Sequence, residues 1–436
     1  MKRMVYRMFF ICIVLVMGCR PAAEPTLDST TIAIGPTAAT KPPELTPTLT
    51  VTIPISTIAP TIISTITPTT VANAPSYILY MMAPESESYG WSATGEGFVY
   101  KLFLNEQGDD SEPVLLTQNE PVRWGPLSGS PDGSRVLLLG NTPAGALIYT
   151  LNPITGDSFP ISLTPFIPIR FFHWHPDNQQ ILMWTYTGRD AGLWLLDIDS
   201  GDHISLITRQ AILAHQMGPV DGGAVSPTGQ TIVYNHTNSF TASEIWSMDS
   251  TGNNRRLLVN TTGSAEFFWS PDGQLVAFVA AIGDQHGVFV MREDGSDLRL
   301  VSSNYVGGHA FPLSWSPNSQ LLAFNGYCEP NPAVHSPTYP YPFRDNPDNN
   351  FQHNIHIVDV WNGEDQPLLS DGCGNADPTW SPDSSQVAFV SFRNGFTEVW
   401  AANVDGSNLR QLSNHQGALV GLPIWLPLEG RNETKQ

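Results

Sequence analysis

The chain has 436 residues, with 40 acidic and 20 basic side chains and a formal net charge of -20. This negative charge argues against nucleic acid as a partner, because phosphate backbones attract basic surfaces. Only 14% of the residues are charged, whereas Gly, Pro and Trp number 36, 37 and 12. Such a composition is typical of a protein with many turns and short strands. The length allows two or three ordinary domains, or one large all-β barrel or propeller.

The first 19 residues have the order of an export signal. Lys2 and Arg3 begin a basic segment, and an apolar run over 8–17 follows that is too short to span a membrane comfortably. The run ends at Gly18-Cys19, which resembles the bacterial lipobox, where the cysteine is acylated and becomes the mature N-terminus. The sequence therefore predicts an exported chain, lipid-anchored to the cell envelope through Cys19. The alternative is an ordinary secretory signal or an uncleaved anchor in which Cys19 is incidental.

Residues 20–75 consist almost entirely of Thr, Pro, Ile, Ala, Ser and Val. Proline interrupts every run of β-forming residues, and no periodic apolar face is present. Because such a segment cannot bury a core, the sequence predicts a disordered, extended stalk. The stalk is expected to carry a propeller over 76–428, followed by a tail over 429–436.

The propeller region repeats itself roughly every 45 to 50 residues, the period of a four-stranded blade. The clearest repeated element is a turn of the form Trp-Ser-Pro-Asp-Gly, in which Pro fixes φ and Asp or Asn with Gly supplies the remaining geometry. A β-branched or apolar strand follows each turn. The turns lie at 130–133, 174–177, 226–229, 269–273, 315–318 and 380–383.

Later in each unit, an aliphatic-aromatic pair, a polar turn and a short apolar strand indicate a hairpin between third and fourth strands. This hairpin occurs seven times, with Tyr100, Tyr149, Trp194, Trp246, Phe289, His356 and Trp400 at the aromatic position. The Ser-Pro turn occurs only six times, so the first unit, which begins at Tyr77, lacks a first strand of its own. Residues 424–427 lie about one period after the last turn and supply it. The sequence therefore predicts an all-β, seven-bladed propeller closed by a C-terminal strand, with six blades as the alternative.

The repeated turns resemble those of TolB-like, WD-type β-propeller repeats, over about 350 residues. The resemblance implies the fold but not a function, because propellers support both binding and catalysis. TolB itself places an α/β domain before six blades, whereas this chain has a stalk before seven, so the partners of TolB are not transferred. Prolyl oligopeptidases join a related propeller to a hydrolase domain, but their Gly-x-Ser-x-Gly elbow is absent from this sequence.

Several conspicuous residues are better explained by structure than by chemistry. No P-loop, His-Glu-x-x-His or Cys-x-x-Cys motif occurs. The Asp-Gly turns at 294–295 and 405–406 lack the spacing of calcium loops, and His356 is expected to be buried and hydrogen-bonded in place of a core aromatic. Tryptophans that recur at one place in each blade favour packing over sugar stacking. These are Trp174, Trp269, Trp315, Trp380 and Trp425.

One face of the predicted ring gathers the candidate functional residues. The connections between blades share this face with the loops between second and third strands, and we call it the upper face. Histidines and carboxylates near the mouth of its central funnel suit metal binding or acid-base chemistry, although long polar loops can also collect histidines without forming a site. The mouth residues are His215, Asp221, Glu266, His309, Asp377 and His415, and the second-to-third loops are expected to add His236, His286, His335 and His353.

The one large insertion, residues 329–352, is also assigned to the upper face. It offers an amphipathic contact surface of the kind that binding sites favour, with an ordered loop packed on its own blade as the alternative. The residues of this surface are Tyr339, Tyr341, Phe343 and Arg344.

Cysteine usage predicts one disulfide. Cys12 leaves with the signal and Cys19 is taken by lipid, which leaves Cys328 and Cys373 as a pair in an oxidising setting. Both are assigned to the upper face, so their bond would pin the base of the insertion.

These features favour a non-enzymatic surface lipoprotein that binds a polypeptide or a glycan and contacts the membrane only through its lipid anchor. No cofactor is predicted by this interpretation. The alternative is a metal-dependent polysaccharide lyase or hydrolase, because oligogalacturonate lyases also use TolB-like propellers with a His-bound metal in the funnel. A divalent metal at the funnel mouth would distinguish the alternative from the binding interpretation.

Overall fold

The structure is a computed structural model in which the chain divides into two compact units, Met1–Ile66 and Thr67–Gln436. The described residues all belong to the second unit and are 76–84, 96–104, 113–117, 122–123, 127–142, 145–161, 169–185, 191–214, 220–239, 242–262, 266–305, 313–328, 353–370, 373–394, 396–415 and 418–427. The predicted signal peptide, stalk and tail lie outside these ranges. Within them, no helix has the length and apolar character needed to cross a membrane.

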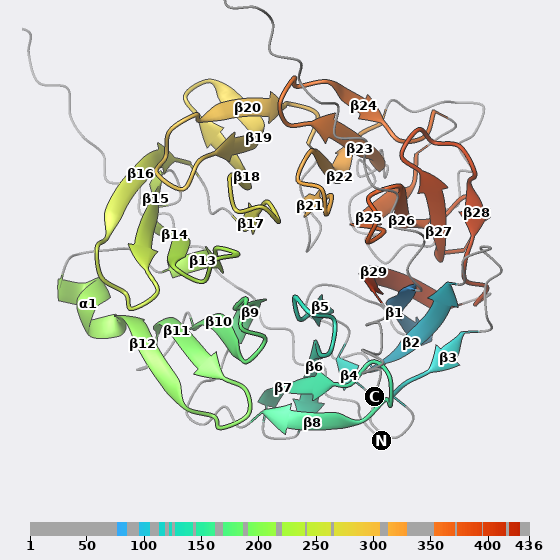
Figure 1. Cartoon of the computed structure of the whole chain (residues 1–436), viewed down its shortest axis with the longest axis horizontal. Coiled ribbons are helices and arrows are strands. Elements are labelled where there is room, and N and C mark those ends of the chain that lie inside the picture. The colour runs from blue at the N-terminus through green and yellow to red at the C-terminus, as the bar shows by residue number, and fades with distance from the viewer. Residues whose placement is uncertain are drawn as a thin grey trace, which may run out of the picture. The chain divides into compact units, whose positions relative to one another are not determined.

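The second unit forms a ring of seven antiparallel blades (Figure 1). Blade 1 consists of β29 (Ala418–Pro427), β1 (Ser76–Pro84), β2 (Glu96–Leu104) and β3 (Val114–Leu115). Blade 2 consists of β5 (Ser128–Gly129), β6 (Val136–Thr142), β7 (Gly145–Leu151) and β8 (Ser158–Ile161), and β4 (Val122–Arg123) pairs with both β2 and β6. Blade 3 consists of β9 (Ile169–Trp174), β10 (Gln180–Thr185), β11 (Gly192–Asp197) and β12 (His203–Thr208).

Blade 4 consists of β13 (Val220–Val225), β14 (Thr231–Ser239), β15 (Ala242–Asp249) and β16 (Arg256–Thr261). Blade 5 consists of β17 (Phe267–Trp269), β18 (Val276–Ile282), β19 (Gln285–Met291) and β20 (Arg299–Ser302). Blade 6 consists of β21 (Leu313–Trp315), β22 (Leu321–Tyr327), β23 (His353–Asp359) and β24 (Asp365–Pro367). Blade 7 consists of β25 (Asn375–Trp380), β26 (Gln386–Ser391), β27 (Glu398–Asn403) and β28 (Arg410–Gln411). A short helix, α1 (Arg209–Ala214), lies in the connection between blades 3 and 4.

The ring closes as the sequence predicts. Strand β29 is the inner strand of blade 1 and pairs antiparallel with β1, placing Ile78 opposite Trp425 and Ser76 opposite Pro427. The first and last described strands therefore share one blade, which pairs an edge that would otherwise remain open. The seven-bladed interpretation is confirmed.

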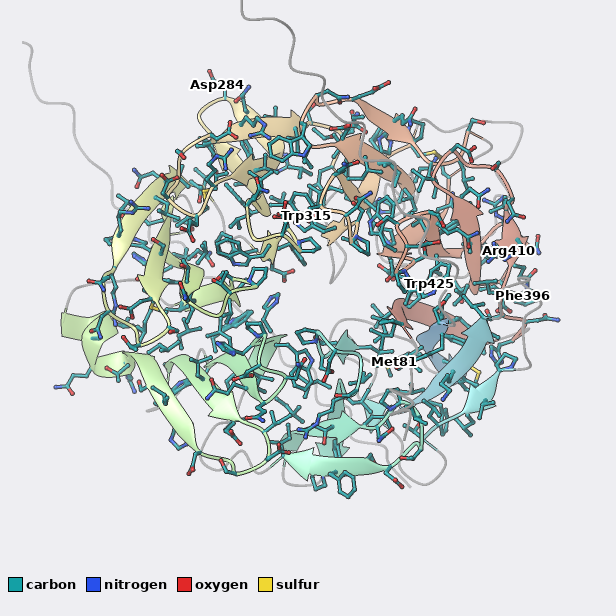
Figure 2. The ribbon with its side chains drawn as sticks, viewed as in Figure 1. Met81, Asp284, Trp315, Phe396, Arg410 and Trp425 are labelled. Atoms are coloured by element: carbon teal, nitrogen blue, oxygen red, sulfur yellow. A yellow bond between two sulfur atoms is a disulfide. The ribbon has the colours of Figure 1, made fainter. Side chains whose placement is uncertain are left out.

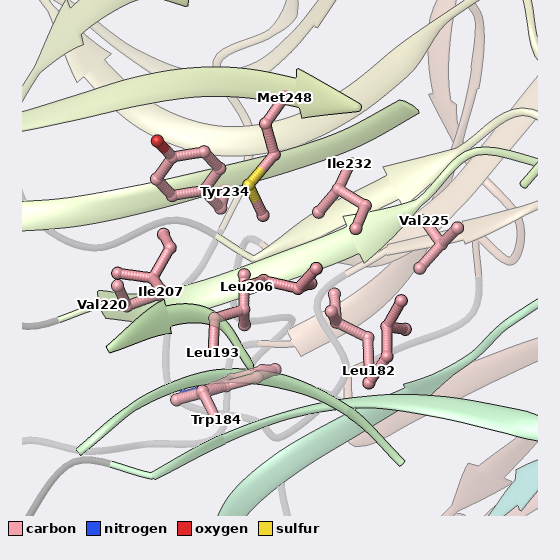
Figure 3. Packing of buried hydrophobic residues seen from close by; sticks show 11 residues of the cluster. Leu182, Trp184, Leu193, Leu206, Ile207, Val220, Val225, Ile232, Tyr234 and Met248 are labelled. Atoms are coloured by element: carbon pink, nitrogen blue, oxygen red, sulfur yellow. The ribbon is translucent and has the colours of Figure 1, made fainter. Parts of the chain in front are cut away.

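Each blade packs on its neighbours through both faces of its sheet. Between blades 3 and 4, Leu182 and Trp184 of β10 meet Ile232 and Tyr234 of β14 in a cluster that excludes water (Figure 3). Burial of such side chains stabilises the fold by about 1.5 to 3 kcal/mol each. The strand alternation required for this packing explains the apolar second strands found after each turn.

The recurring tryptophans link neighbouring inner strands, which confirms their packing role. Their indole N–H groups donate across the blade interfaces to backbone carbonyls of the preceding inner strand. In Figure 2, Trp315 and Trp425 lie toward the centre of the ring. The bonds are Trp174 to Ser128 (2.9 Å), Trp269 to Ala224 (3.3 Å), Trp315 to Phe268 (2.8 Å) and Trp380 to Ser314 (2.9 Å), while Trp425 donates to Ser76 Oγ (2.9 Å).

Some of the Ser-Pro turns bond to one another across blade interfaces, on the face opposite the upper face. The residue after the Asp, Asn or Thr adopts a left-handed conformation, and it is glycine in three turns, as at Gly273 with φ of 72°. Where it is not glycine, its side chain accepts the backbone N–H of the preceding blade's turn. These bonds run from Asp132 to Asn178 (3.0 Å), from Asp272 to Ser319 (3.0 Å) and from Asn318 to Ser384 (3.1 Å). The lower face is thus built from tight turns that bond to one another.

Candidate functional site

Three of the six predicted mouth residues have described side chains, and they lie at three different blade interfaces. Glu266 immediately precedes β17 in blade 5, Asp377 lies in β25 of blade 7, and His415 lies in the connection from β28 to β29. Asp221 and Asp377 lie inside the inner strands β13 and β25, which begin earlier than the turn motif suggests.

The remaining predicted site residues lie outside the described residues. These are His215, His309, Tyr339, Tyr341, Phe343 and Arg344, and the side chain of Asp221 belongs with them. Three expectations are corrected, because His236, His286 and His353 lie within β14, β19 and β23 instead of in the loops between second and third strands. His236 is buried, with Nε2 lying 3.3 Å from Glu244 Oε2. It is held there because residues 231–239 continue the second strand past the apolar core.

At the start of blade 5, Glu266 is mostly buried on the side of Phe268 and Tyr305, which pack between blades 5 and 6. Burial raises the pKa of its carboxyl to about 7, and the same carboxylate adds to the burial that raises the pKa of Tyr305 to about 12. A carboxyl in this state is poised between its neutral and charged forms near neutral pH. Neither a hydrogen bond nor an ion pair of Glu266 is found among the described residues.

At the interface between blades 6 and 7, Asp377 lies at an irregularity in the pairing of β25 with β26 and has φ of 56°. Its backbone N–H donates to Oδ1 of Asn325, a residue of β22, over 3.1 Å. Two further buried asparagines continue this polar contact, since Nδ2 of Asn375 donates to Oδ1 of Asn354 over 3.0 Å. The blade interface is therefore cross-linked by one backbone to side-chain bond and one bond between side chains.

The disulfide lies beside this polar interface. Cys328 follows β22 and Cys373 precedes β25, and the two form the predicted bond with their Cα atoms 5.7 Å apart. The bridge thus fixes the residue at which the insertion 329–352 leaves blade 6.

At the interface between blades 7 and 1, the connection carrying His415 is held by a buried carboxylate. Glu398, 1% exposed, accepts the His415 N–H at Oε1 (2.6 Å) and the Ser413 hydroxyl at Oε2 (2.5 Å). His415 Nε2 lies 2.7 Å from the buried hydroxyl of Tyr80, and the ring of Tyr100 packs 4.8 Å from the imidazole.

The ionisable groups of this cluster are shifted by burial. Burial raises the pKa of Glu398, against the hydrogen bonds from Ser413 and His415, and lowers the pKa of His415. The pKa of Tyr80 is raised by burial and by the charge of Glu398. Ser413 donates its hydroxyl to Glu398 and accepts the Val399 N–H, so both bonds tie this segment to β27. The cluster holds the closing connection in place.

The centre of the ring is narrowed by side chains. The imidazole of His173 on β9 packs 6.3 Å from the ring of Phe268 on β17, although their blades are not neighbours, and 6.5 Å from the ring of Trp184. Burial lowers the pKa of His173 to about 4, so this imidazole is neutral near pH 7. A ligand reaching the centre from the upper face would meet apolar rings at this level.

His356 behaves as the sequence predicts. It is buried and hydrogen-bonded, with Nδ1 2.8 Å from Asp365 Oδ1 and Nε2 3.0 Å from the carbonyl of Tyr327. Among the described residues, no three His, Cys, Asp or Glu side chains are close enough to hold one metal ion.

The sequence interpretation missed two buried asparagines on second strands. Asn235 and Asn325 each follow the Ser of their blade's turn by nine residues, at a place where blades 5 and 7 carry Val279 and Val390. A comparison of the repeats position by position could have found them, because a buried amide in place of valine is a departure from the apolar pattern.

No family model matches the chain. An uncharacterised protein of Agrobacterium fabrum is 28% identical over 264 residues, which covers 55% of this chain and 84% of that protein. The Tol-Pal system protein TolB of Hydrogenovibrio crunogenus is 29% identical over 66 residues, or 15% of each chain. This chain therefore matches only a small part of the length of that TolB.

Solved structures are similar in fold. The β-propeller domain of the Trilobed protease from Pyrococcus furiosus has a TM-score of 0.50 at 14% identity, over 78% of this chain and 95% of that one. The chain is a β-propeller. An oligogalacturonate lyase from Vibrio parahaemolyticus also has a TM-score of 0.50, at 12% identity, over 78% of this chain and 86% of the lyase. The Trilobed protease domain has an open velcro topology, whereas this ring closes through β29 and β1.

Proposed function

We propose that this chain is an exported, lipid-anchored binding module, without catalytic activity, that holds a polypeptide or a glycan on the upper face of its propeller. The observation that carries the proposal is the contrast between the two faces. Tight turns on the lower face bond to one another, while the upper face has the disulfide at the base of the insertion 329–352 and partly buried carboxylates at separate blade interfaces. Binding surfaces of propellers are built from irregular connections of this kind.

The disulfide also supports export, because bonds of this kind persist in oxidising compartments. Cys328 and Cys373 are joined in the structure, which agrees with a chain that leaves the cytoplasm. Lipid anchoring at Cys19 is tested by Cys19→Ser, which should block acylation and release the protein from the membrane fraction. If Cys19→Ser protein still partitions with membranes, another segment anchors it.

Binding is tested with the full chain on a glycan array and on a peptide array. Replacing 329–352 by a short Gly-Ser link should abolish the signal of any bound ligand while the thermal melting temperature stays within a few degrees. Asp294→Asn is the matched control, because Asp294 is in an exposed hairpin turn of the lower face. Loss of binding on Asp294→Asn alone, with the shortened variant binding normally, would place the site on the other face.

A second measurement distinguishes the binding proposal from the alternative of a metal-dependent lyase or hydrolase. Titration of the full chain with manganese, followed by incubation with polygalacturonate, should show neither stoichiometric binding nor chain cleavage. Cleavage that depends on manganese and is lost in His309→Ala would replace the binding proposal by the enzymatic one.

A further inference from the structure

We propose that His356, held as an imidazolium by Asp365, fixes the root of the insertion 329–352, and that loss of its proton at higher pH releases this root. By the root we mean Tyr327 and Cys328, the two residues directly before the insertion. The inference rests on the proposed function and deepens it, because it names a regulation of the upper face by pH.

His356 belongs to a closed circuit of hydrogen bonds between blades 5 and 6. Its Nε2 lies 3.0 Å from the carbonyl oxygen of Tyr327, and its Nδ1 lies 2.8 Å from Oδ1 of Asp365. The other carboxylate oxygen, Oδ2, accepts the hydroxyl of Ser302 over 2.5 Å and the Nδ2 group of Asn304 over 2.8 Å. The circuit closes where the Tyr327 N–H donates to the Asn304 carbonyl over 2.6 Å. Both backbone polar groups of Tyr327 are therefore held by this network.

The two bonds of the imidazole require an additional proton. A neutral imidazole carries one N–H, whereas a carbonyl oxygen can only accept a hydrogen bond. Nε2 must therefore carry a hydrogen to bond to Tyr327, and the contact between Nδ1 and Asp365 needs a second hydrogen. This second proton lies either on Nδ1, which makes the ring an imidazolium, or on the carboxyl of Asp365. In both cases the pair holds one proton more than a neutral histidine beside an ionised aspartate.

The surroundings of Asp365 favour the imidazolium. Burial by itself would raise the pKa of the Asp365 carboxyl, but the hydrogen bonds from His356 and Ser302 bring that pKa below its ordinary value. The carboxyl is therefore ionised, and the second proton belongs to the ring. The side chains of His356 and Asp365 are 8% and 11% exposed, so the two charges compensate each other inside the fold.

The fold does not require a histidine at this position. The equivalent residues are Phe289 in blade 5 and Trp400 in blade 7. His356 keeps an aromatic contact, since its ring centroid lies 5.8 Å from that of Phe324, but it adds two bonds that a phenylalanine cannot make. Gly326 leaves room for the ring, because a Cβ there would lie 2.3 Å from Cδ2 of His356.

The network meets the insertion at Tyr327. This residue ends β22, and Cys328 and the insertion 329–352 follow it directly. The disulfide to Cys373 ties the root to blade 7, and the hydrogen-bond network ties it to blade 5. Loss of the network therefore removes one of the two attachments of the root and leaves the other.

Loss of the second proton breaks one bond of the circuit. The remaining N–H is expected on Nδ1, because a bond to a carboxylate is about twice as strong as a bond to a neutral carbonyl. Nε2 then presents a lone pair to the Tyr327 carbonyl, and the two groups repel each other. Since the native state binds the extra proton, the stability it provides is present at low pH and is lost as the pH rises through the titration of the ring.

Other titratable groups surround the pair. On the side of blade 5, Tyr305 pairs with Gly326, and its pKa is raised to about 12 by burial and by Glu266. An ionised Glu266 favours the imidazolium, because a negative charge stabilises a cation. Each measurement is therefore repeated in Glu266→Gln: a transition that persists belongs to His356, and one that disappears belongs to Glu266 and overturns the inference. The remaining charged or titratable groups on the packed strands are Arg299 on β20, Tyr327 on β22, His353 and Asp359 on β23, and Asp377 on β25.

The first measurement is the protonation state of the ring in the full chain, solubilised in detergent. Histidines labelled with 15N are followed by NMR from pH 5 to pH 9, and His356→Phe identifies the signal of His356 by its loss. Both ring nitrogens should be protonated at the acidic end, and one should lose its hydrogen as the pH rises. A ring that carries one hydrogen at every pH overturns the inference.

The second measurement is the order of the root. Hydrogen exchange of the peptide that contains Tyr327, corrected for the intrinsic effect of pH on exchange, should lose protection at least fivefold over the pH range in which the ring titrates. His356→Phe should remove this dependence on pH. Asp365→Asn keeps the shape but removes the counter-charge, so it should shift the loss to lower pH. Asp294→Asn, on the lower face, should behave as wild type. Protection that does not change with pH, or that changes equally in His356→Phe, overturns the inference.

Binding separates this inference from the proposed function. A peptide or glycan that the full chain binds on the arrays at pH 6 through the insertion 329–352 should bind at least fivefold more weakly at pH 9, and His356→Phe should abolish the difference. If such a probe binds equally at both values, the proposed function stands and the regulation fails. If no probe depends on the insertion, the proposed function fails, and NMR and hydrogen exchange still decide whether the imidazolium fixes the root.

Discussion

Two pairs of neighbouring blades in this propeller carry the same residue types at the same places, yet they differ in how those residues are satisfied. Between blades 6 and 7, Asn325 accepts the Asp377 N–H, and a disulfide at 328 and 373 joins the same two blades. In blade 4, Asn235 has no hydrogen-bond partner among the described residues, and Glu266 of blade 5 has no counter-charge among them.

The difference shows that equivalent positions in a repeat do not have equivalent roles. Asp377 is folded back by its positive φ, which brings its N–H to the asparagine of the preceding blade. Glu266 lies before a short, regular inner strand and makes no such contact with the described residues. Asn325 thus has one bonded atom, Oδ1, although its Nδ2 has no partner among the described residues, whereas neither polar atom of the Asn235 side chain has a partner among them.

The largest effect is expected from removing the ring closure on which both interfaces depend. Deleting 418–436 removes β29, which exposes the edge of β1 and the cluster containing Ile78, Tyr80 and Trp425. We expect the cooperative unfolding transition to disappear from melting curves recorded by circular dichroism. A truncated chain that melts like the full one would show that blade 1 is stable with three strands.

Breaking the disulfide should weaken only the interface between blades 6 and 7. The bridge closes a loop with a sequence separation of 45 residues, so its loss from Cys328→Ser with Cys373→Ser should cost about 3 to 4 kcal/mol of unfolding free energy. Urea denaturation of the double variant measures this cost. The pKa of the Glu266 carboxyl, measured by carbon NMR, should not change in this variant, because that carboxyl lies at a different interface.

Glu266→Gln should sharpen the contrast through its dependence on pH. The native pKa of Glu266, about 7, is above its ordinary value of 4.5, so the native state favours the neutral form. The stabilisation that comes from this preference for the neutral carboxyl is fully present below pH 4.5 and is lost as the pH rises through 7. Glu266→Gln keeps a neutral side chain and should be more stable than wild type at pH 8 by roughly 2 kcal/mol, with no difference at pH 4.

The control for this titration is an exposed carboxyl. Asp294 accepts a bond from the Ser296 hydroxyl, which lowers its pKa. Asp294→Asn should therefore show no gain of stability at pH 8. Equal melting curves of Glu266→Gln and wild type from pH 4 to pH 8 would mean that the carboxyl has a counter-charge after all.

The smallest effect is expected from substituting Asn325 and Asn235 and comparing the two variants directly. Asn325→Val removes the acceptor of the Asp377 N–H and should cost about 1 kcal/mol. Asn235→Val removes a buried amide that makes no bond to the described residues and should leave stability unchanged or raise it slightly. Thermal melting of the two variants side by side measures the contrast, and equal destabilisation would show that Asn235 is bonded in the protein.

Much of the architecture was determined by the sequence itself. Turns that begin at residues such as Ser130 and Ser270 mark the repeats along the chain. Because the first repeat lacks a first strand of its own, it required the strand containing Trp425. These features are local, because turn geometry and strand alternation follow from neighbouring residues. The disulfide and the burial of His356 could be predicted for the same reason, from position within a counted repeat.

The state of each candidate site residue was decided only by the tertiary structure. The sequence placed Glu266, Asp377 and His415 together at one mouth. In the structure Glu266 affects the pKa of Tyr305, Asp377 bonds to Asn325 and His415 lies beside Tyr80, each at its own interface. A pKa, a missing hydrogen bond or a carboxylate bound by a distant serine depends on which blades pack together and on how deeply each group is buried. Those quantities arise from contacts between residues far apart in the chain, and no local pattern encodes them.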